Sequence, residues 1–230
     1  MSVNPSDKGL LTPQNCIVIL IDHQPQMFFG VASIDRQKLL NNLMVLAKAA
    51  KIFGVPVVLT AIESKEFAGD LLPELLELFP GERPIERSTM NSWDNGDFVA
   101  AVMKTGRRNL VIAALWTEVC LAMPALQALT DGYFVYAVED ASGGMSIVGH
   151  HAALRRMEQA GAVSVTALQV LLEFQRDWAR NEHSDEVIRA VKAHCNVFDM
   201  SGEGVITEVS KTDFPTKAEP AATNLNQQKH

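Results

Sequence analysis

Short apolar runs rich in β-branched residues recur along the chain, and longer stretches with helical spacing separate them. The first run is CIVILI, from Cys16 to Ile21. A continuous apolar run of this length is typical of a strand buried on both faces of a sheet. The same pattern predicts further strands at Pro56–Ala61, Asn109–Leu115, Tyr133–Val138 and Val163–Thr166.

Between the strands, apolar residues recur every three or four positions, which predicts amphipathic helices. The clearest case is Asp35–Phe53, with leucines at helical spacing. The segment Pro80–Asp94 shows neither pattern and is predicted to be a long loop. Further helices are expected at Leu71–Phe79, Asp97–Thr105, Val119–Thr130, Ile147–Gln159, Leu168–Arg180 and Asp185–His194.

Strands that alternate with helices of this length indicate parallel pairing, with helices on both faces of the sheet. We therefore predict a doubly wound α/β domain within residues 1–200. Residues 201–230 are polar and poor in apolar clusters. This composition predicts a flexible tail, or one ordered only against a neighbouring subunit.

Composition narrows the class of protein. The formal net charge of −7 argues against a nucleic-acid partner, which would require a basic face. No apolar run resembles a signal peptide or is long enough to span a membrane. We therefore expect a cytoplasmic protein, and the acidic charge favours a small-molecule substrate or a protein partner. The 3 cysteines form no CxxC pair, which suits free thiols in a reducing compartment. The 6 histidines show no spacing typical of a metal site, so none is expected.

Candidate catalytic residues follow two of the predicted strands. Ligands of an open parallel sheet bind beyond the carboxyl ends of its strands, where Asp22 follows the first strand and Cys120 the third. A thiol in the first turn of a helix is expected to have a lowered pKa because of the helix dipole, and a carboxylate within reach can act as its base. The structural alternatives are that Asp22 caps a turn and that Cys120 is a small core residue.

A cation and an oxyanion site would complete this chemistry. Arg87 is the candidate cation and Arg83 its rival, although either could be a solvated surface arginine. The backbone N–H groups of Trp116 and Cys120 lie where a helix is predicted to begin, which suits a developing oxyanion.

Several segments together resemble the isochorismatase-like cysteine hydrolase superfamily, and within it the YcaC-type subgroup. The resemblance covers nearly all of residues 10 to 200 and implies a three-layer αβα sandwich with a mostly parallel sheet of about six strands. It also implies a homo-oligomer, and suggests an octamer. The segments are LIDHQ (Leu20–Gln24), ERSTMNSWDNGDFV (Glu86–Val99), TEVC (Thr117–Cys120), DASGG (Asp140–Gly144), ALRRMEQAGA (Ala153–Ala162) and EFQRDW (Glu173–Trp178).

The resemblance further implies a catalytic triad in which Cys120 is the nucleophile, Asp22 the base and Arg87 the cation. Many members of the superfamily have lysine in place of this arginine. Because arginine does not readily release a proton, it can act here only as a fixed cation. A cis peptide bond is implied at Leu115–Trp116. Zinc-dependent nicotinamidases of the superfamily carry an Asp-x-His motif after the second strand, whereas this chain reads TAIESKEF there, so no cofactor is expected.

These observations predict a cofactor-free hydrolase that cleaves a small amide or similar acyl C–N bond through a thioester. Vinyl-ether hydrolysis by isochorismatases requires no cysteine nucleophile, so Cys120 points away from that reaction. Phe28, Asn91, Trp93 and Trp116 are the candidate pocket residues, although both tryptophans fit a core position equally well. The alternative is a non-hydrolytic assembly or redox-responsive protein with a peroxide-sensitive Cys120.

Overall fold

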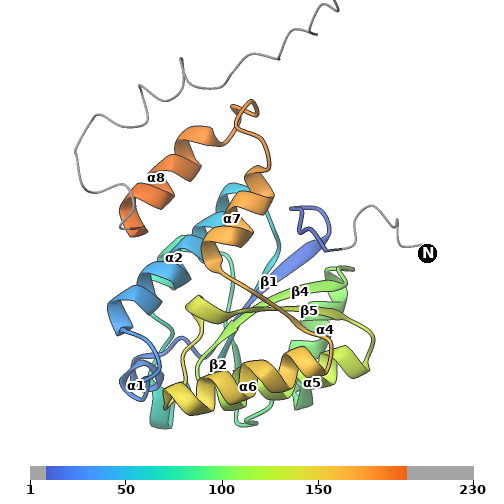
Figure 1. The fold of residues 1–230 in the computed structure, drawn as a ribbon. Coiled ribbons are helices and arrows are strands. Elements are labelled where there is room, and N and C mark those ends of the chain that lie inside the picture. Colours follow the sequence, from blue (N-terminus) through green and yellow to red (C-terminus); the bar gives the residue numbers. More distant parts are fainter. Residues whose placement is uncertain (1–8, 196–230) are drawn as a thin grey trace, which may run out of the picture. The chain divides into compact units, whose positions relative to one another are not determined.

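The computed structural model describes residues 9–195, whose strands form a six-stranded parallel sheet (Figure 1). The strand order is β3-β2-β1-β4-β5-β6, so the chain winds outward from β1 on one side and from β4 on the other. The boundary expected at residue 200 and the tail at 201–230 lie outside the described residues. The strands are β1 (Cys16–Ile21), β2 (Val57–Ile62), β3 (Ile85–Arg87), β4 (Asn109–Ala114), β5 (Phe134–Val138) and β6 (Val163–Val165).

Helices cover both faces of the sheet, which confirms the predicted three-layer αβα sandwich (Figure 1). One face carries α2 (Arg36–Ile52), α3 (Pro73–Leu78), α7 (Ala167–Gln175) and α8 (Ser184–His194). The other carries α4 (Gly96–Lys104), α5 (Ala122–Thr130) and α6 (Ile147–Gln159). The remaining elements are short: α1 (Pro25–Phe29), the π-helices η2 (Ser64–Ala68) and η4 (Thr117–Leu121), and the 3-10 helices η3 (Ser92–Asp94) and η5 (Glu139–Ala141).

Strand β1 lies inside the sheet and is buried along its whole length. Ile17, Ile19 and Ile21 belong to the core cluster beneath α4, α5 and α6, whereas Val18 and Leu20 belong to the cluster beneath α2 and α7. Successive side chains of a strand point to opposite faces of the sheet. A strand covered on both faces must therefore be apolar at every position, which is why the continuous apolar runs predicted the parallel sheet.

One strand of the sheet, β3, lies where the hydrophobic pattern predicts a loop. Residues Ile85–Arg87, expected to belong to a loop, pair in parallel with β2 and form the edge strand β3. Only Arg87 of these three residues is buried. A three-residue edge strand contains no apolar run, so the hydrophobic pattern could not reveal it.

Two helix boundaries also differ from the prediction. The helix expected at Val119–Thr130 begins earlier, at Thr117, as the π-helix η4 and continues as α5. Helix α7 ends at Gln175 because Arg176 adopts a φ of +60°, outside the right-handed helical region. Among the described residues, no helix is long and apolar enough to cross a membrane.

Candidate active site

The candidate site lies where the winding of the sheet reverses, between β1 and β4. Ile21 at the end of β1 is paired with Ala114 at the end of β4. The residues that follow these two strands therefore meet at the same edge of the sheet. This edge is the general ligand-binding position of doubly wound sheets, and it brings Asp22 and the Trp116–Cys120 turn together.

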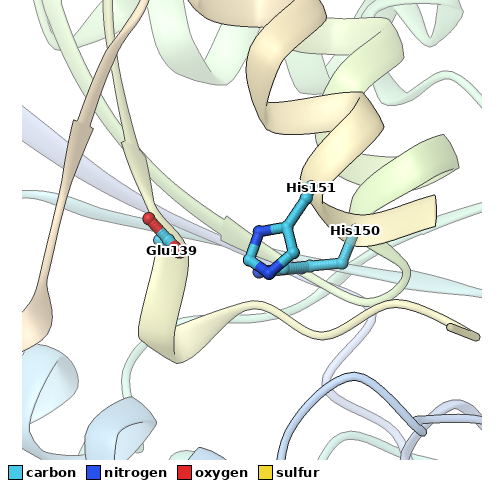
Figure 2. Close-up of side chains that lie close together, drawn as sticks. All are labelled: Glu139, His150 and His151. Atoms are coloured by element: carbon cyan, nitrogen blue, oxygen red, sulfur yellow. The ribbon is translucent and has the colours of Figure 1, made fainter. Parts of the chain in front are cut away.

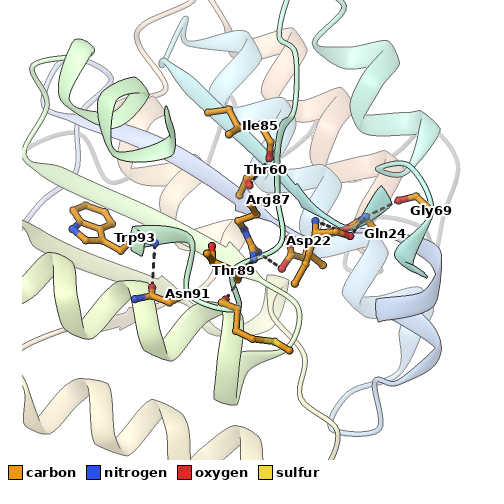
Figure 3. A network of polar contacts seen from close by, with 11 residues as sticks. Asp22, Gln24, Thr60, Gly69, Ile85, Arg87, Thr89, Asn91 and Trp93 are labelled. Carbon is orange, nitrogen blue, oxygen red and sulfur yellow. Dashed lines mark hydrogen bonds and ion pairs between the residues drawn. The ribbon is translucent and has the colours of Figure 1, made fainter. Parts of the chain in front are cut away.

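Asp22 and Arg87 form a buried ion pair at this edge (Figure 3). One terminal nitrogen of Arg87 donates to Oδ2 of Asp22, and the other donates to the carbonyl of Thr89 and, at 3.5 Å, to that of Met90. These hydrogen bonds to the loop after β3 hold the planar guanidinium of Arg87 in one orientation. Arg83, the rival in the sequence, is exposed.

The two residues after Asp22 tie β1 to its surroundings. Nε2 of His23 lies 3.2 Å from the carbonyl of Ala141, in the segment after β5. The amide of Gln24 donates to the carbonyls of Ile62 and Gly69 and accepts from the N–H of Ile62 at 3.0 Å. Both side chains are buried. Asp22 is therefore followed by two buried side chains, His23 and Gln24, that help to position it. The sequence pattern does not indicate this role for either residue.

Cys120 lies in η4 and is only 2% exposed. Its thiol interacts with the carboxyl of Asp22. Oδ1 of this carboxyl is buried and has no hydrogen-bond partner within the described part of the chain. Burial raises the pKa of Asp22 to about 6, although Arg87 and the thiol both act to lower it. Asp22 is therefore mostly ionised at neutral pH and can accept a proton.

The expectation of a lowered thiol pKa at a helix start is wrong for the resting site. Burial raises the pKa of Cys120 far above its ordinary range, and the negative charge of Asp22 raises it further, whereas Arg87 acts in the opposite direction. Desolvation and a like charge both disfavour a thiolate, and here they outweigh the start of a short π-helix. The resting pair is a thiol and a carboxylate.

The turn between β4 and η4 carries the candidate oxyanion donors. The peptide bond between Leu115 and Trp116 is cis, as the resemblance implies. Leu115 forms a bridge with Gly143 of the DASGG segment, and the N–H of Thr117 donates to the carbonyl of Gly143 at 3.0 Å. The N–H of Cys120 donates to the carbonyl of Trp116 at 2.8 Å. It could therefore donate to an oxyanion only through a bifurcated hydrogen bond. Within the described residues, no acceptor is found for the N–H of Trp116.

The four candidate pocket residues differ in their surroundings. Trp93 is a core residue whose indole donates to Asp131 at 2.7 Å, and Asn91 caps the turn that contains it (Figure 3). Phe28 is partly buried, with its ring 6.4 Å from that of His23. Trp116 is also partly buried, and its indole donates to a backbone carbonyl of α1. Phe28 and Trp116 thus fit a pocket wall better than Asn91 and Trp93 do.

One serine of the DASGG segment also supports the site. The hydroxyl of Ser142 accepts from the N–H of Ala114 at 3.1 Å and donates to the carbonyl of Val138 at 2.8 Å. It thereby connects the ends of β4 and β5, because Ala114 is the last residue of one and Val138 the last residue of the other. The sequence alone does not predict this role for Ser142, because a serine in a loop has no distinctive pattern.

Other features of the described residues lie outside the triad. Two surface hollows are lined by residues of α2, α3 and α8 and include no triad residue. One set of three side chains, Glu139, His150 and His151, is grouped closely enough to hold a metal ion.

Comparisons with known proteins agree with this geometry. The Isochorismatase domain model matches residues 16–169. The probable hydrolase YcaC of Escherichia coli is 42% identical over 173 residues, which cover 75% of this chain and 83% of that protein.

Two solved structures are similar over most of the chain. YcaC from Pseudomonas aeruginosa, solved with hexane-2,5-diol and covalent acrylamide, is 35% identical with a TM-score of 0.78 and covers 84% of this chain and 94% of its own. The E. coli YcaC structure, described as an octameric hydrolase of unknown specificity, is 37% identical with a TM-score of 0.78 and covers 84% and 93%. The chain belongs to the Isochorismatase domain family and, within it, to the YcaC-type hydrolases.

Proposed function

We propose that the protein is a cofactor-free cysteine hydrolase that cleaves a small amide or similar acyl C–N bond. The observation that carries the proposal is the arrangement around Asp22. One carboxylate oxygen is bound by the fixed cation Arg87, and the carboxylate interacts with the thiol of Cys120. A nucleophile, a base within its reach and a third group that orients the base are the parts that covalent catalysis requires.

The protonation states define the order of events. At rest the proton is on sulfur, so Asp22 removes it as the sulfur attacks the substrate carbonyl. The same proton then passes from Asp22 to the departing amine as the C–N bond breaks, leaving a thioester on Cys120. Water, deprotonated by Asp22, cleaves the thioester and releases the acid, and the proton returns to sulfur. Arg87 transfers no proton in this sequence and acts as a fixed positive charge throughout.

The N–H of Trp116 is the proposed principal donor to the oxyanion. It lies two residues beyond the end of β4 and donates to no acceptor within the described residues. A preorganised backbone donor of this kind is typically worth about 3 kcal/mol in the transition state. The N–H of Cys120 contributes if its bond to the carbonyl of Trp116 is shared.

The covalent acrylamide in the P. aeruginosa relative supports a reactive nucleophile in this subgroup. Acrylamide is also a small planar amide, and a substrate of this size suits a site whose catalytic groups are buried. Carried over to this chain, the expected position of attachment is Cys120.

A peroxide-sensing role for Cys120 is the weaker candidate. Oxidation by peroxide requires an accessible thiolate. Cys120 is 2% exposed, and burial together with Asp22 raises its pKa. Both properties slow the reaction of the thiol with peroxide. They are compatible with hydrolysis, because Asp22 removes the thiol proton only as the sulfur attacks the substrate.

The test is labelling with acrylamide followed by intact-mass and peptide mass spectrometry, together with a screen of small amides for release of the amine. We expect one adduct, on Cys120, and loss of both adduct and turnover in Cys120→Ala. Asp22→Asn removes the base, so labelling should slow by at least roughly a hundredfold. Equal labelling of Cys16, Cys120 and Cys195, with no turnover of any amide, would contradict the proposal.

We also propose that the chain forms a homo-oligomer, as the E. coli relative does. Large apolar side chains that are exposed in the single chain are available for burial between subunits. Native mass spectrometry would establish the number of subunits, and a monomer at micromolar concentration would contradict this proposal. These side chains include Phe29, Phe67, Met90, Ile147, Val148 and Trp178.

A further inference from the structure

A second group of chemically competent side chains lies at the carboxyl edge of the sheet, apart from the triad. Glu139 begins the segment after β5, and His150 and His151 lie in the first turns of α6 (Figure 2). One ligand atom from each residue lies within 4.8 Å of those of the other two. Nothing in the proposed hydrolysis uses these three residues.

His150 is held in the orientation of a metal ligand. It is 5% exposed, and its Nδ1 lies 2.7 Å from the hydroxyl of Thr117. Thr117 is itself buried and anchored through its N–H to the carbonyl of Gly143. When Nδ1 donates to this hydroxyl, the lone pair of Nε2 is free to bind a cation. A second hydrogen bond that fixes the ring in this way is the usual support of a metal-bound histidine.

The charges around His150 favour a cation. The carboxylates of Glu139 and Glu118 both lie near enough to His150 to act on its charge. One oxygen of Glu118 accepts from the N–H of Met145 at 2.9 Å. Its other oxygen is buried without a hydrogen-bond partner in the described residues. Two carboxylates beside an imidazole are surroundings that attract a cation.

We infer that Glu139, His150 and His151 bind a divalent transition-metal ion of the Zn²⁺ type. Imidazole and carboxylate ligands suit Zn²⁺, Co²⁺ and Ni²⁺ better than Mg²⁺ or Ca²⁺, which prefer oxygen alone. Two histidines and one glutamate are also a ligand set found in open zinc sites, where a fourth position is left for water or another ligand.

Small side-chain movements are sufficient to close the site. Ligand atoms around tetrahedral zinc lie about 3.4 Å apart, since each bond is about 2.0–2.1 Å long. The ligand atoms must move roughly 1 Å closer together. The side chains that can make this movement are those of His151, which is exposed, and Glu139, which is half-buried. His150 keeps its place against Thr117.

The site would act on the nucleophile turn through a short connection. Thr117 is the first residue of η4, the π-helix that also contains Cys120. A metal bound to His150 restrains the ring against Thr117 and thereby steadies this turn. Metal binding does not depend on the proposed hydrolysis, so the two can fail separately.

The test is a titration of the untagged, metal-free full chain with Co²⁺, under reducing conditions, followed by visible absorption. We expect saturation at one equivalent, with bands of nitrogen and oxygen ligation and without the intense thiolate-to-cobalt charge-transfer band. Competition with Zn²⁺ should abolish the cobalt spectrum, and Zn²⁺ should raise the Tm.

The matched variants are Glu139→Gln and His151→Gln, which remove ligands at positions that are not fully buried. Each should weaken Co²⁺ binding at least roughly tenfold. His183→Gln changes a half-buried histidine that pairs with Glu186 on α8, and this variant should bind Co²⁺ as the wild type does. Unchanged affinity in Glu139→Gln and His151→Gln, a thiolate band, or no saturable binding would each overturn the inference.

Discussion

Replacing Arg87 by methionine should destabilise the protein in a strongly pH-dependent way. The substitution keeps an unbranched chain in the buried space but leaves Asp22 without its cation. At an effective dielectric constant of about 20, two unit charges about 4 Å apart interact by about 4 kcal/mol. Losing this interaction raises the pKa of Asp22 well above its wild-type value of about 6.

The sign of the effect follows from the direction of this shift. A carboxyl whose folded pKa lies above its ordinary value of 3.8 releases its proton more readily when unfolded, so stability is lost as the pH rises towards the folded pKa. The wild type stops losing stability near pH 6, whereas the variant continues to lose it at higher pH, by about 1.4 kcal/mol for each pH unit. The pH-dependent part of the added cost is therefore near zero at pH 5, about 1.4 kcal/mol at pH 7 and about 4 kcal/mol at pH 9, where it reaches the whole of the lost interaction.

Urea unfolding at these three pH values, at one fixed protein concentration, measures the difference. Arg83→Met removes an exposed arginine of the same loop and should show no such trend. The double variant Asp22→Asn/Arg87→Met lacks the titrating group and should lose only a pH-independent amount, from the hydrogen bonds to the loop carbonyls. A loss in Arg87→Met that is equal at pH 5 and pH 9 would refute the argument that Arg87 holds a buried carboxylate in its ionised form.

Three further changes have defined outcomes. The rate of Cys120 labelling by acrylamide should rise with pH through about 6, as Asp22 loses its proton; a rate that is flat from pH 5 to 7 would exclude Asp22 as the base. Gly30→Ala places a Cβ in steric clash with the indole ring of Trp116 and should lower both the Tm and the labelling rate, whereas Gly81→Ala, with open space around it, should change neither. Gln24→Leu leaves two buried backbone groups of Ile62 and the half-buried carbonyl of Gly69 without their partner and should cost about 3 kcal/mol in urea unfolding; a loss under 1 kcal/mol would show that water replaces the amide.

The use of arginine where many relatives have lysine has a physical consequence for the proposed reaction. Arg87 cannot exchange a proton, so every proton transfer of the cycle falls to Asp22. A carboxyl with a pKa near neutrality can both accept and release a proton with little free-energy cost. The burial that raises the pKa of Asp22 to about 6 is thus matched to this double role.

The sequence by itself determined the layers of the fold and one half of the candidate site. Strands covered on both faces must be apolar at every position, so β1, β2, β4 and β5 were visible as continuous runs. The positions of Asp22 and Cys120 then followed from the rule that parallel strands end at a common edge. Each of these inferences depends only on neighbouring residues and on the periodicity of side-chain burial.

Other features were decided by the tertiary structure. The ion pair joins residues 65 positions apart and rests on a three-residue edge strand that has no hydrophobic signature, so the pattern could not choose between Arg87 and Arg83. The raised pKa of Cys120 comes from desolvation and from Asp22, which outweigh the local helix start on which the sequence argument depended. The grouping of Glu139 with His150 likewise needs the end of one strand to meet the start of a later helix. Local pattern fixes which residues are buried, whereas the free energy of a charge depends on what lies around it in space.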